Sequence, residues 1–292
     1  MSANASKHLK FGALALMVLV LCASPALYQR GMAAWQAYQD QKATKITYDR
    51  IIVACLGEQH LSLPVSETTT KLMNCVHSHS QHGVNDAFWA LRRTGDKGIA
   101  ERLYSQIKQP EQTLPVMECS MRAKLLAHLL NRLGIKNHHV VITQMGEEER
   151  GDVFWDHVVV EIINPDTGRL ELYDPTYNSY YEDMETDARL NIADVLSLPE
   201  ERIRICLANE KTCTDERSAA AKKAFKRVWP YFGIAYRDAY REPEFLRGPL
   251  LLNPERFDIE TRFKVGEKVM NFCEKKEDQC AARRILLPLD QS

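Results

Sequence analysis

A leucine-rich segment in the middle of the chain limits the possible fold more than any other feature of the sequence. Its leucines recur at the spacing that places them on one face of an α-helix: Leu125, Leu126, Leu129, Leu130 and Leu133. Gly134 follows them, as expected just after the C-terminus of a helix. A helix with one apolar face must bury that face, so this helix is predicted to lie in the core.

Three predicted strands follow the predicted helix, and the first two are rich in β-branched residues. They cover residues 137–144, 154–163 and 169–173. The second and third are separated by Asn-Pro-Asp-Thr-Gly at 164–168, a strong turn signal that predicts a hairpin. A helix followed by antiparallel strands is typical of the α+β class.

The flanking regions are predicted to be mainly helical. Helical patterns occur at 35–41, 48–56 and 85–107, separated by a polar segment at 62–70, and again at 215–229 and 260–276. Residues 246–254 are predicted to form a connecting loop. We therefore expect a helical N-terminal part at 30–110, a core at 111–200, and a helical C-terminal part at 201–292 packed on the core.

Residues 1–28 have the pattern of an export signal or a membrane anchor. Lys7 and Lys10 precede an uncharged apolar run at 11–22, and Ser24-Pro25-Ala26 offers small residues to a signal peptidase. Counted through Tyr28, the run reaches about the lower length limit of a membrane-spanning helix. Cleaved signal and uncleaved anchor both remain open. A lipoprotein site at Cys22 is disfavoured because bulky Leu21 precedes it. We expect an exported, periplasmic or otherwise extracytoplasmic protein, anchored in the inner membrane by residues 11–28 if these are retained.

The cysteines agree with export. The chain has eight, and disulfide pairs are expected for Cys206–Cys213 and Cys273–Cys280, with Cys55–Cys75 as a possible third. Cys22 belongs to the signal segment. This pairing leaves Cys119 as the odd thiol, which is either buried and inert or chemically employed.

Charge and histidine content argue against two other classes of protein. The 38 basic and 39 acidic residues give a net charge of −1, and no basic tract suggests a nucleic-acid partner. The tract Cys75-Val-His77-Ser-His79-Ser-Gln-His82 has the composition of a metal site. A solvated loop or helix end is the preferred interpretation of such a short tract. No metal or cofactor is therefore expected.

Cys119 stands at the N-terminus of the predicted helix, where the helix dipole favours a thiolate. A nucleophilic thiolate also needs a base. His128 is excluded, because nine residues along a helix place it turned by ~900° and ~13 Å away. His138 and His139 point to opposite faces of their strand, which suggests one core and one surface residue. His157 begins the second strand and is the better candidate.

The predicted hairpin supplies a partner for this histidine. If the turn is centred near Asp166, opposed residues have numbers adding up to about 331 or 332, which places His157 opposite Asp174 or its neighbour. A carboxylate bonded to one ring nitrogen fixes the tautomer and leaves the other nitrogen for the thiol. The predicted catalytic residues are Cys119, His157 and Asp174.

The same stretch resembles the transglutaminase-like family. The resemblance covers about residues 114–177 and rests on Glu118-Cys119, the helix ending Leu133-Gly134-Ile135, His157-Val-Val-Val, and Tyr173-Asp174-Pro175-Thr176. It implies a papain-like core, with the cysteine on a helix packed on an antiparallel sheet that carries the histidine and the aspartate. Two positions depart from the family pattern. Met117-Glu118 stands where a glycine is usual, and Val158-Val159 replaces the aromatic common after the histidine.

The resemblance implies a thiol-dependent acyl-transfer enzyme acting on a protein or peptide amide through a thioester. Hydrolysis, as in a protease or amidase, is preferred over amine transfer, as in a transglutaminase. The alternative is a catalytically silent binding or scaffold domain tethered at the membrane, which the two departures keep open. The sequence does not assign the oxyanion donor, beyond the backbone N–H of Cys119.

Overall fold

The structure, a computed structural model, describes residues 3–57, 62–110, 113–144, 156–210, 212–224, 232–239, 246–252, 263–265 and 268–270, with side chains described only between residues 29 and 219. The chain divides into two compact units, Met1–Ile46 and Thr47–Ser292. The candidate site belongs entirely to the second unit.

Helices predominate up to Arg132, and strands predominate after it. The helices are α1 (Ala3–Leu56), α2 (Val65–Ser78), α3 (Asp86–Arg93), α4 (Gly95–Lys108), α5 (Cys119–Arg132), α6 (Ile192–Ser197) and α7 (Asp215–Ala224). The strands are β1 (Gln81–His82), β2 (Val116–Met117), β3 (Asn137–Gln144), β4 (Asp156–Asn164), β5 (Arg169–Asp174), β6 (Ser179–Asp183), β7 (Ile203–Leu207), β8 (Phe232–Ala239), β9 (Leu246–Leu252), β10 (Phe263–Val265) and β11 (Lys268–Met270).

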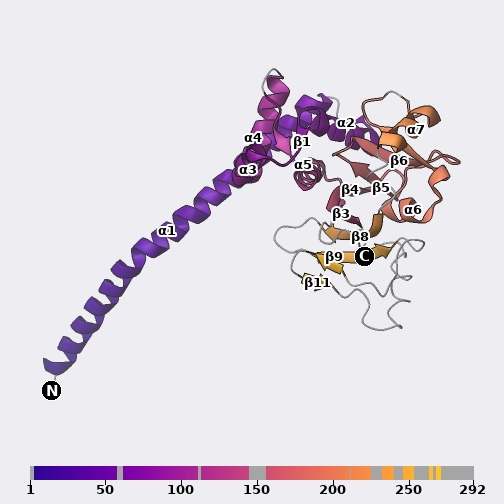
Figure 1. The fold of residues 1–292 in the computed structure, drawn as a ribbon. Helices are drawn as coiled ribbons and strands as arrows, with labels where there is room; N and C mark the ends of the chain where they lie inside the picture. The colour runs from indigo at the N-terminus through magenta and orange to yellow at the C-terminus, as the bar shows by residue number, and fades with distance from the viewer. Residues whose placement is uncertain are drawn as a thin grey trace, which may run out of the picture. The chain divides into compact units, whose positions relative to one another are not determined.

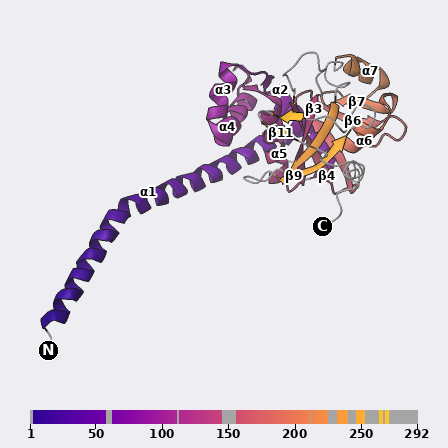
Figure 2. The same cartoon turned by 60° about the horizontal axis from the view of Figure 1, so that its bottom comes forward.

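A sheet of seven strands forms the centre of the second unit, in the order β7-β6-β5-β4-β3-β8-β9. All neighbouring strands run antiparallel. Figures 1 and 2 show α5 lying beside the sheet, where it contacts β3 and β4. The predicted α+β class is therefore confirmed, although the sheet has more strands than the sequence suggested.

Alternate residues of the strands enter two separate cores, as the pleat of a sheet requires. On one face Val158, Val160 and Ile162 of β4 pack with the leucines of α5 and with residues of α1 to α4. On the other face Val159 packs with Val140 and with residues of α6 and β7. The site described below depends on this first core, because it fixes α5 against β4.

The C-terminus of α5 explains why the central helix could be predicted so well. Leu125, Leu126, Leu129 and Leu130 are all buried. Gly134 has φ of 74°, and the N–H of Ile135 reaches back to the carbonyl of Leu130 at 3.0 Å. This is the Schellman arrangement, in which glycine takes the left-handed conformation without a Cβ clash.

Three predictions outside the central segment are wrong. The polar segment at 62–70 is not a spacer throughout, because α2 begins at Val65. The single helix expected at 85–107 is divided into α3 and α4 at Thr94. The C-terminal part is not mainly helical, since β9 replaces the loop expected at 246–254, and β10 and β11 occupy the helix expected at 260–276.

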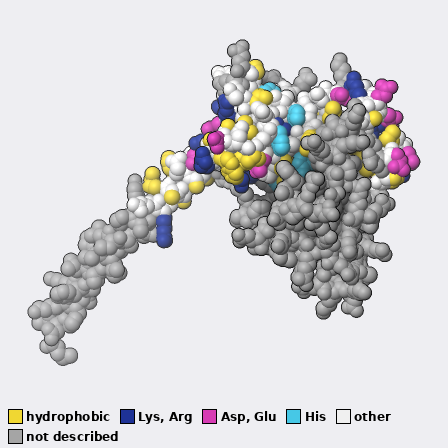
Figure 3. All heavy atoms as spheres, viewed as in Figure 1, with side chains coloured by type: hydrophobic (Ala, Val, Ile, Leu, Met, Phe, Trp, Pro, Cys, Tyr) yellow, Lys and Arg dark blue, Asp and Glu magenta, His cyan; other side chains and the backbone are white. Residues whose placement is uncertain are grey.

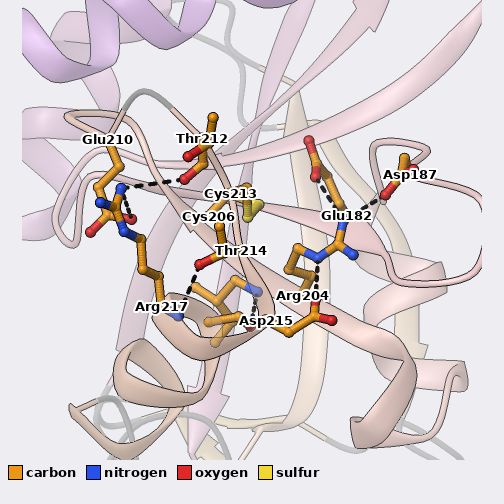
Figure 4. Close-up of a disulfide and its surroundings, with 12 residues drawn as sticks. Glu182, Asp187, Arg204, Cys206, Glu210, Thr212, Cys213, Thr214, Asp215 and Arg217 are labelled. Atoms are coloured by element: carbon orange, nitrogen blue, oxygen red, sulfur yellow. Dashed lines mark hydrogen bonds and ion pairs between the residues drawn. A yellow bond between two sulfur atoms is a disulfide. The ribbon is translucent and has the colours of Figure 1, made fainter.

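Two disulfides occur among the described residues, Cys55–Cys75 and Cys206–Cys213. The first joins the end of α1 to α2. The second joins β7 to the segment before α7, beside a group of ion pairs centred on Arg204 (Figure 4). The expected pair Cys206–Cys213 is confirmed, and the pair Cys55–Cys75, predicted as a possible third, is also formed. Cys119 is the cysteine of the described part that forms no disulfide. Cys273 and Cys280 lie outside the described residues.

The predicted signal or anchor at 1–28 lies where no side chain is described, although the backbone of α1 begins at Ala3. Within the part of the chain that the structure describes, no helix has the length and apolar character needed to cross a membrane.

Candidate active site

Cys119 is the first residue of α5, and a short parallel ladder fixes the backbone that leads into it. Met117 of β2 is fully buried and pairs with His82 of β1. Glu118 is the N-cap, and its side chain makes no cap bond to the first turn. The partly buried thiol therefore stands at the positive end of a helix dipole, which favours a thiolate.

His157 forms a close pair with Asp174. The two side chains are 12% and 2% exposed, and Nε2 of the ring lies 2.7 Å from Oδ2 of the carboxylate. The other carboxylate oxygen, Oδ1, accepts from the backbone N–H groups of Thr176 at 2.9 Å and Tyr177 at 3.1 Å. Because both oxygens have partners, the carboxylate cannot rotate without losing hydrogen bonds, and it holds the ring in one orientation.

The pairing of these residues does not use the predicted register. Asn164 pairs with Arg169 and Val160 with Tyr173, so the numbers of paired residues add up to 333. Tyr173 pairs with Val160, and Asp174 is the next residue of β5. His157 therefore lies diagonally across from Asp174 and not directly opposite it. Alternation along both strands still puts the two side chains on the same face. A diagonal separation is within reach of a long side chain.

The Cys119 thiol is the second partner of the His157 ring, beside Asp174. Cys119 hydrogen bonds with His157, and since Nε2 is occupied by Asp174, Nδ1 is the nitrogen that faces sulfur. Burial alone would lower the pKa of His157, but the charge and hydrogen bond of Asp174, together with Cys119, raise that pKa to about 10. The imidazole is therefore protonated near neutral pH.

Arg122 is buried close to Asp174 and Cys119, and the sequence analysis did not predict it as a site residue. It is one turn after Cys119 on α5 and is 1% exposed. Its Nη1 donates to the carbonyl of Thr176 at 3.0 Å, and its Nη2 to the carbonyl of Ser80 at 2.7 Å. Burial lowers its pKa to about 10, against the negative charges of Asp174 and Cys119. The sequence did contain a signal that Arg122 is buried, because its spacing places it on the leucine face of the predicted helix.

The histidine tract at 75–82 divides between several roles. His77 lies in the last turn of α2, and its Nδ1 is 3.4 Å from Nη1 of Arg122. Its pKa is lowered, first by burial and then by the Arg122 charge. Nδ1 of His79 lies 2.9 Å from the carbonyl of Cys75. His82 belongs to β1. Among the described residues, these imidazoles do not come together as a set of metal ligands.

The other histidines lie away from the thiol. His128 contacts Asp96 at 3.4 Å and stacks on Tyr48. His138 and His139 point to opposite faces, as predicted, but neither is a surface residue. His138 is buried and lies 2.6 Å from Glu161, and His139 lies against the backbone of Ala123 on α5. The expectation of one surface histidine failed because both faces of β3 are covered.

No protein-family model matches the chain, and neither a curated protein nor a solved structure matches it.

Proposed function

We propose that the protein is an exported thiol-dependent acyl-transfer enzyme with a transglutaminase-like, papain-like core. Cys119 is the nucleophile, His157 the general acid and base, and Asp174 the residue that orients the ring. The observation that carries the proposal is the position of one buried imidazole between a free thiol and a carboxylate that is itself held by two backbone N–H groups.

The chemistry divides into two half-reactions. The Cys119 sulfur attacks the carbonyl carbon of an amide, and the C=O electrons move onto oxygen. When the intermediate collapses, the C–N bond breaks and the Nδ1 proton of His157 goes to the leaving amine. This leaves a thioester and a neutral imidazole. His157 then takes a proton from water, or from a second amine, as that nucleophile attacks the thioester and the sulfur departs.

The substrate is an amide of a protein or peptide, and hydrolysis is the preferred outcome. Two disulfides support an oxidising compartment outside the cytoplasm. If residues 11–28 are retained, they hold the site at the outer side of the inner membrane. The chain balances 38 basic against 39 acidic residues, so nothing in its charge calls for a nucleic-acid partner.

An acyl-enzyme trapped on Cys119 would test this function. Full-length protein is incubated with p-nitrophenyl acetate and quenched in acid, where thioesters survive. We expect peptide mass mapping to find the acetyl group on Cys119 in the parent, and no corresponding adduct in Cys119→Ser. A folded protein whose Cys119 is neither acylated nor alkylated faster than an ordinary thiol would favour the silent scaffold instead.

The pH dependence of alkylation should report the charge on His157. Because the pKa of His157 is raised to about 10, the ring stays protonated below that pH and loses its proton above it. The rate of Cys119 alkylation by iodoacetamide should therefore change little between about pH 7 and 9. In His157→Ala the alkylation rate should rise with pH across the same range, as it does for a thiol without a cationic neighbour. Parallel slopes in the two proteins would contradict the ion pair.

A further inference from the structure

The inference drawn below rests on the proposed function. Acyl transfer also needs a group that stabilises the oxyanion of the tetrahedral intermediate. Hydrogen-bond donors aimed at that oxygen commonly supply a large share of the rate acceleration. The residues assigned so far are the nucleophile, the base and its orienting carboxylate. The side chain of Glu118 is an acceptor for the Ser120 hydroxyl at 2.7 Å, so it offers no donor.

The ladder of β1 and β2 brings His82 beside the backbone that leads into Cys119. Gln81 N–H donates to the carbonyl of Pro115 at 2.9 Å, and Gly83 N–H to that of Met117 at 3.2 Å. These two bonds bracket His82 and set it beside Met117, two residues before Cys119. With strands ~4.8 Å apart and ~3.3 Å of rise per residue, the Cα atoms of His82 and Cys119 are ~8 Å apart. An imidazole can span much of that distance.

His82 differs from every other histidine whose side chain is described. Six of these seven have a hydrogen-bond or close polar partner within the protein: His77, His79, His128, His138, His139 and His157. His82 is exposed, and no partner for its ring is found among the described residues. Figure 3 shows histidine side chains (cyan) reaching the surface close together on the face in view. An exposed imidazole without a partner in the described part of the chain is available to a ligand.

Partial burial and the neighbouring positive charges favour the neutral form of the His82 ring. Its pKa is lowered, first by partial burial and then by the positive charges of Arg122 and His157, against the smaller opposite effects of Asp174 and Glu118. These influences also show that the ring lies near the thiol's own neighbours. A neutral imidazole carries one N–H to donate and adds no repulsion to the protonated His157.

We propose that His82 is a further catalytic residue, whose ring N–H donates a hydrogen bond to the oxyanion formed when the Cys119 sulfur attacks a carbonyl. No proton is transferred in this contact. The negative charge that develops on oxygen is held by the ring until the C–N or C–O bond breaks and the carbonyl reforms.

The test compares acylation with alkylation on the same sulfur. Acylation by p-nitrophenyl acetate passes through an oxyanion, whereas alkylation by iodoacetamide does not. In full-length His82→Ala we expect the Cys119 acylation rate to fall by about 10²- to 10³-fold. The alkylation rate should stay within about twofold of the parent. His82→Gln, whose amide also carries N–H groups, should recover part of the acylation rate. Cys119→Ser supplies the background of other thiols.

Two results would overturn the inference. One is a His82→Ala protein that is acylated as fast as the parent. The other is an equal loss of acylation and alkylation in a folded variant, because that would mean damage to the thiolate itself. Trp89→Phe serves as a control, since Trp89 is an exposed N–H donor on α3. If it alone slows acylation, the donor is the indole. Failure of the parent to acylate at all would instead refute the proposed function.

Discussion

Replacing His157 by alanine should slow acyl transfer by about 10³-fold or more, and alkylation of Cys119 at pH 7 by about tenfold. Without the imidazolium, only a few per cent of an ordinary thiol is ionised at pH 7. The larger intrinsic nucleophilicity of an unstabilised thiolate offsets part of that loss in alkylation, but not in acyl transfer. Acyl transfer suffers more because it also loses the proton donor for the leaving group. Stopped-flow acylation and iodoacetamide kinetics give the two rates.

His138→Ala is a matched control for this variant. His138 also forms a buried pair with a carboxylate, 2.6 Å from Glu161, in the same sheet, but the pair has no thiol beside it. Replacing His138 should lower the stability of the fold, but the rates of acyl transfer and of Cys119 alkylation per folded molecule should stay near those of the parent. Equal kinetic losses in the two variants would mean that any buried histidine pair supports the site, and the assignment of His157 would be wrong.

The acylation rate of Asp174→Asn should lie between those of His157→Ala and His138→Ala, for a specific geometric reason. Oδ1 of Asp174 accepts from two backbone N–H groups, so the amide oxygen of asparagine takes that position. The amide NH₂ then faces Nε2 of His157 and forces the ring proton onto Nδ1. A neutral ring protonated at Nδ1 cannot accept a proton on the side of sulfur. Residual acylation should remain, because nucleophile and ring are both present.

The sequence predicted the pairing of His157 with Asp174 from the hairpin register, but the alternation of side chains along the strands is what places them on one face. The predicted strands at 137–144 and 169–173 agree with β3 and β5 to within one residue, because the first contains a β-branched run and the second follows the turn signal at 164–168. The hairpin turn was misplaced because Gly168 takes the left-handed φ of 68° and its N–H donates to Asn164, which moves the turn centre. The strand ladder shifts by one or two residues, from a sum of 332 or 331 to 333. His157 and Asp174 still share a face, because the residue opposite His157 lies two residues beyond Asp174.

Two other wrong predictions, at α2 and at β10 and β11, have identifiable physical causes. Helix α2 contains a run of threonines, which are poor helix formers in isolation. In the fold Thr68 and Thr69 are buried, and the hydroxyls of Thr69 and Thr70 bond the carbonyls of Val65 and Ser66. Tertiary packing thus overrides propensity. Gly266-Glu267, between β10 and β11, is a two-residue hairpin signal that the amphipathic pattern concealed.

The arrangement around Arg122 could not be predicted, because it depends on three segments that are distant in sequence. Ser80 follows α2, Thr176 follows β5, and Arg122 reaches both carbonyls from α5. A single guanidinium therefore ties together the segments that carry His82 and Asp174. Spacing along one helix indicates only that the arginine is buried, not what it binds.

Arg122→Met should accordingly destabilise the fold by about 3–5 kcal/mol, because it leaves two buried carbonyls without donors and removes the cation beside Asp174. For a domain of this size that corresponds to a lowering of the melting temperature by about 10 °C. Arg132→Met tests the same substitution in the last turn of the same helix. Arg132 makes two 2.8 Å bonds to Asp49, with the two side chains 36% and 50% exposed, so its loss should cost at most about 1 kcal/mol. Thermal unfolding followed by circular dichroism compares the two. Equal shifts would show that Arg122 contributes no more than a surface ion pair, and its role in holding the site together would have to be abandoned.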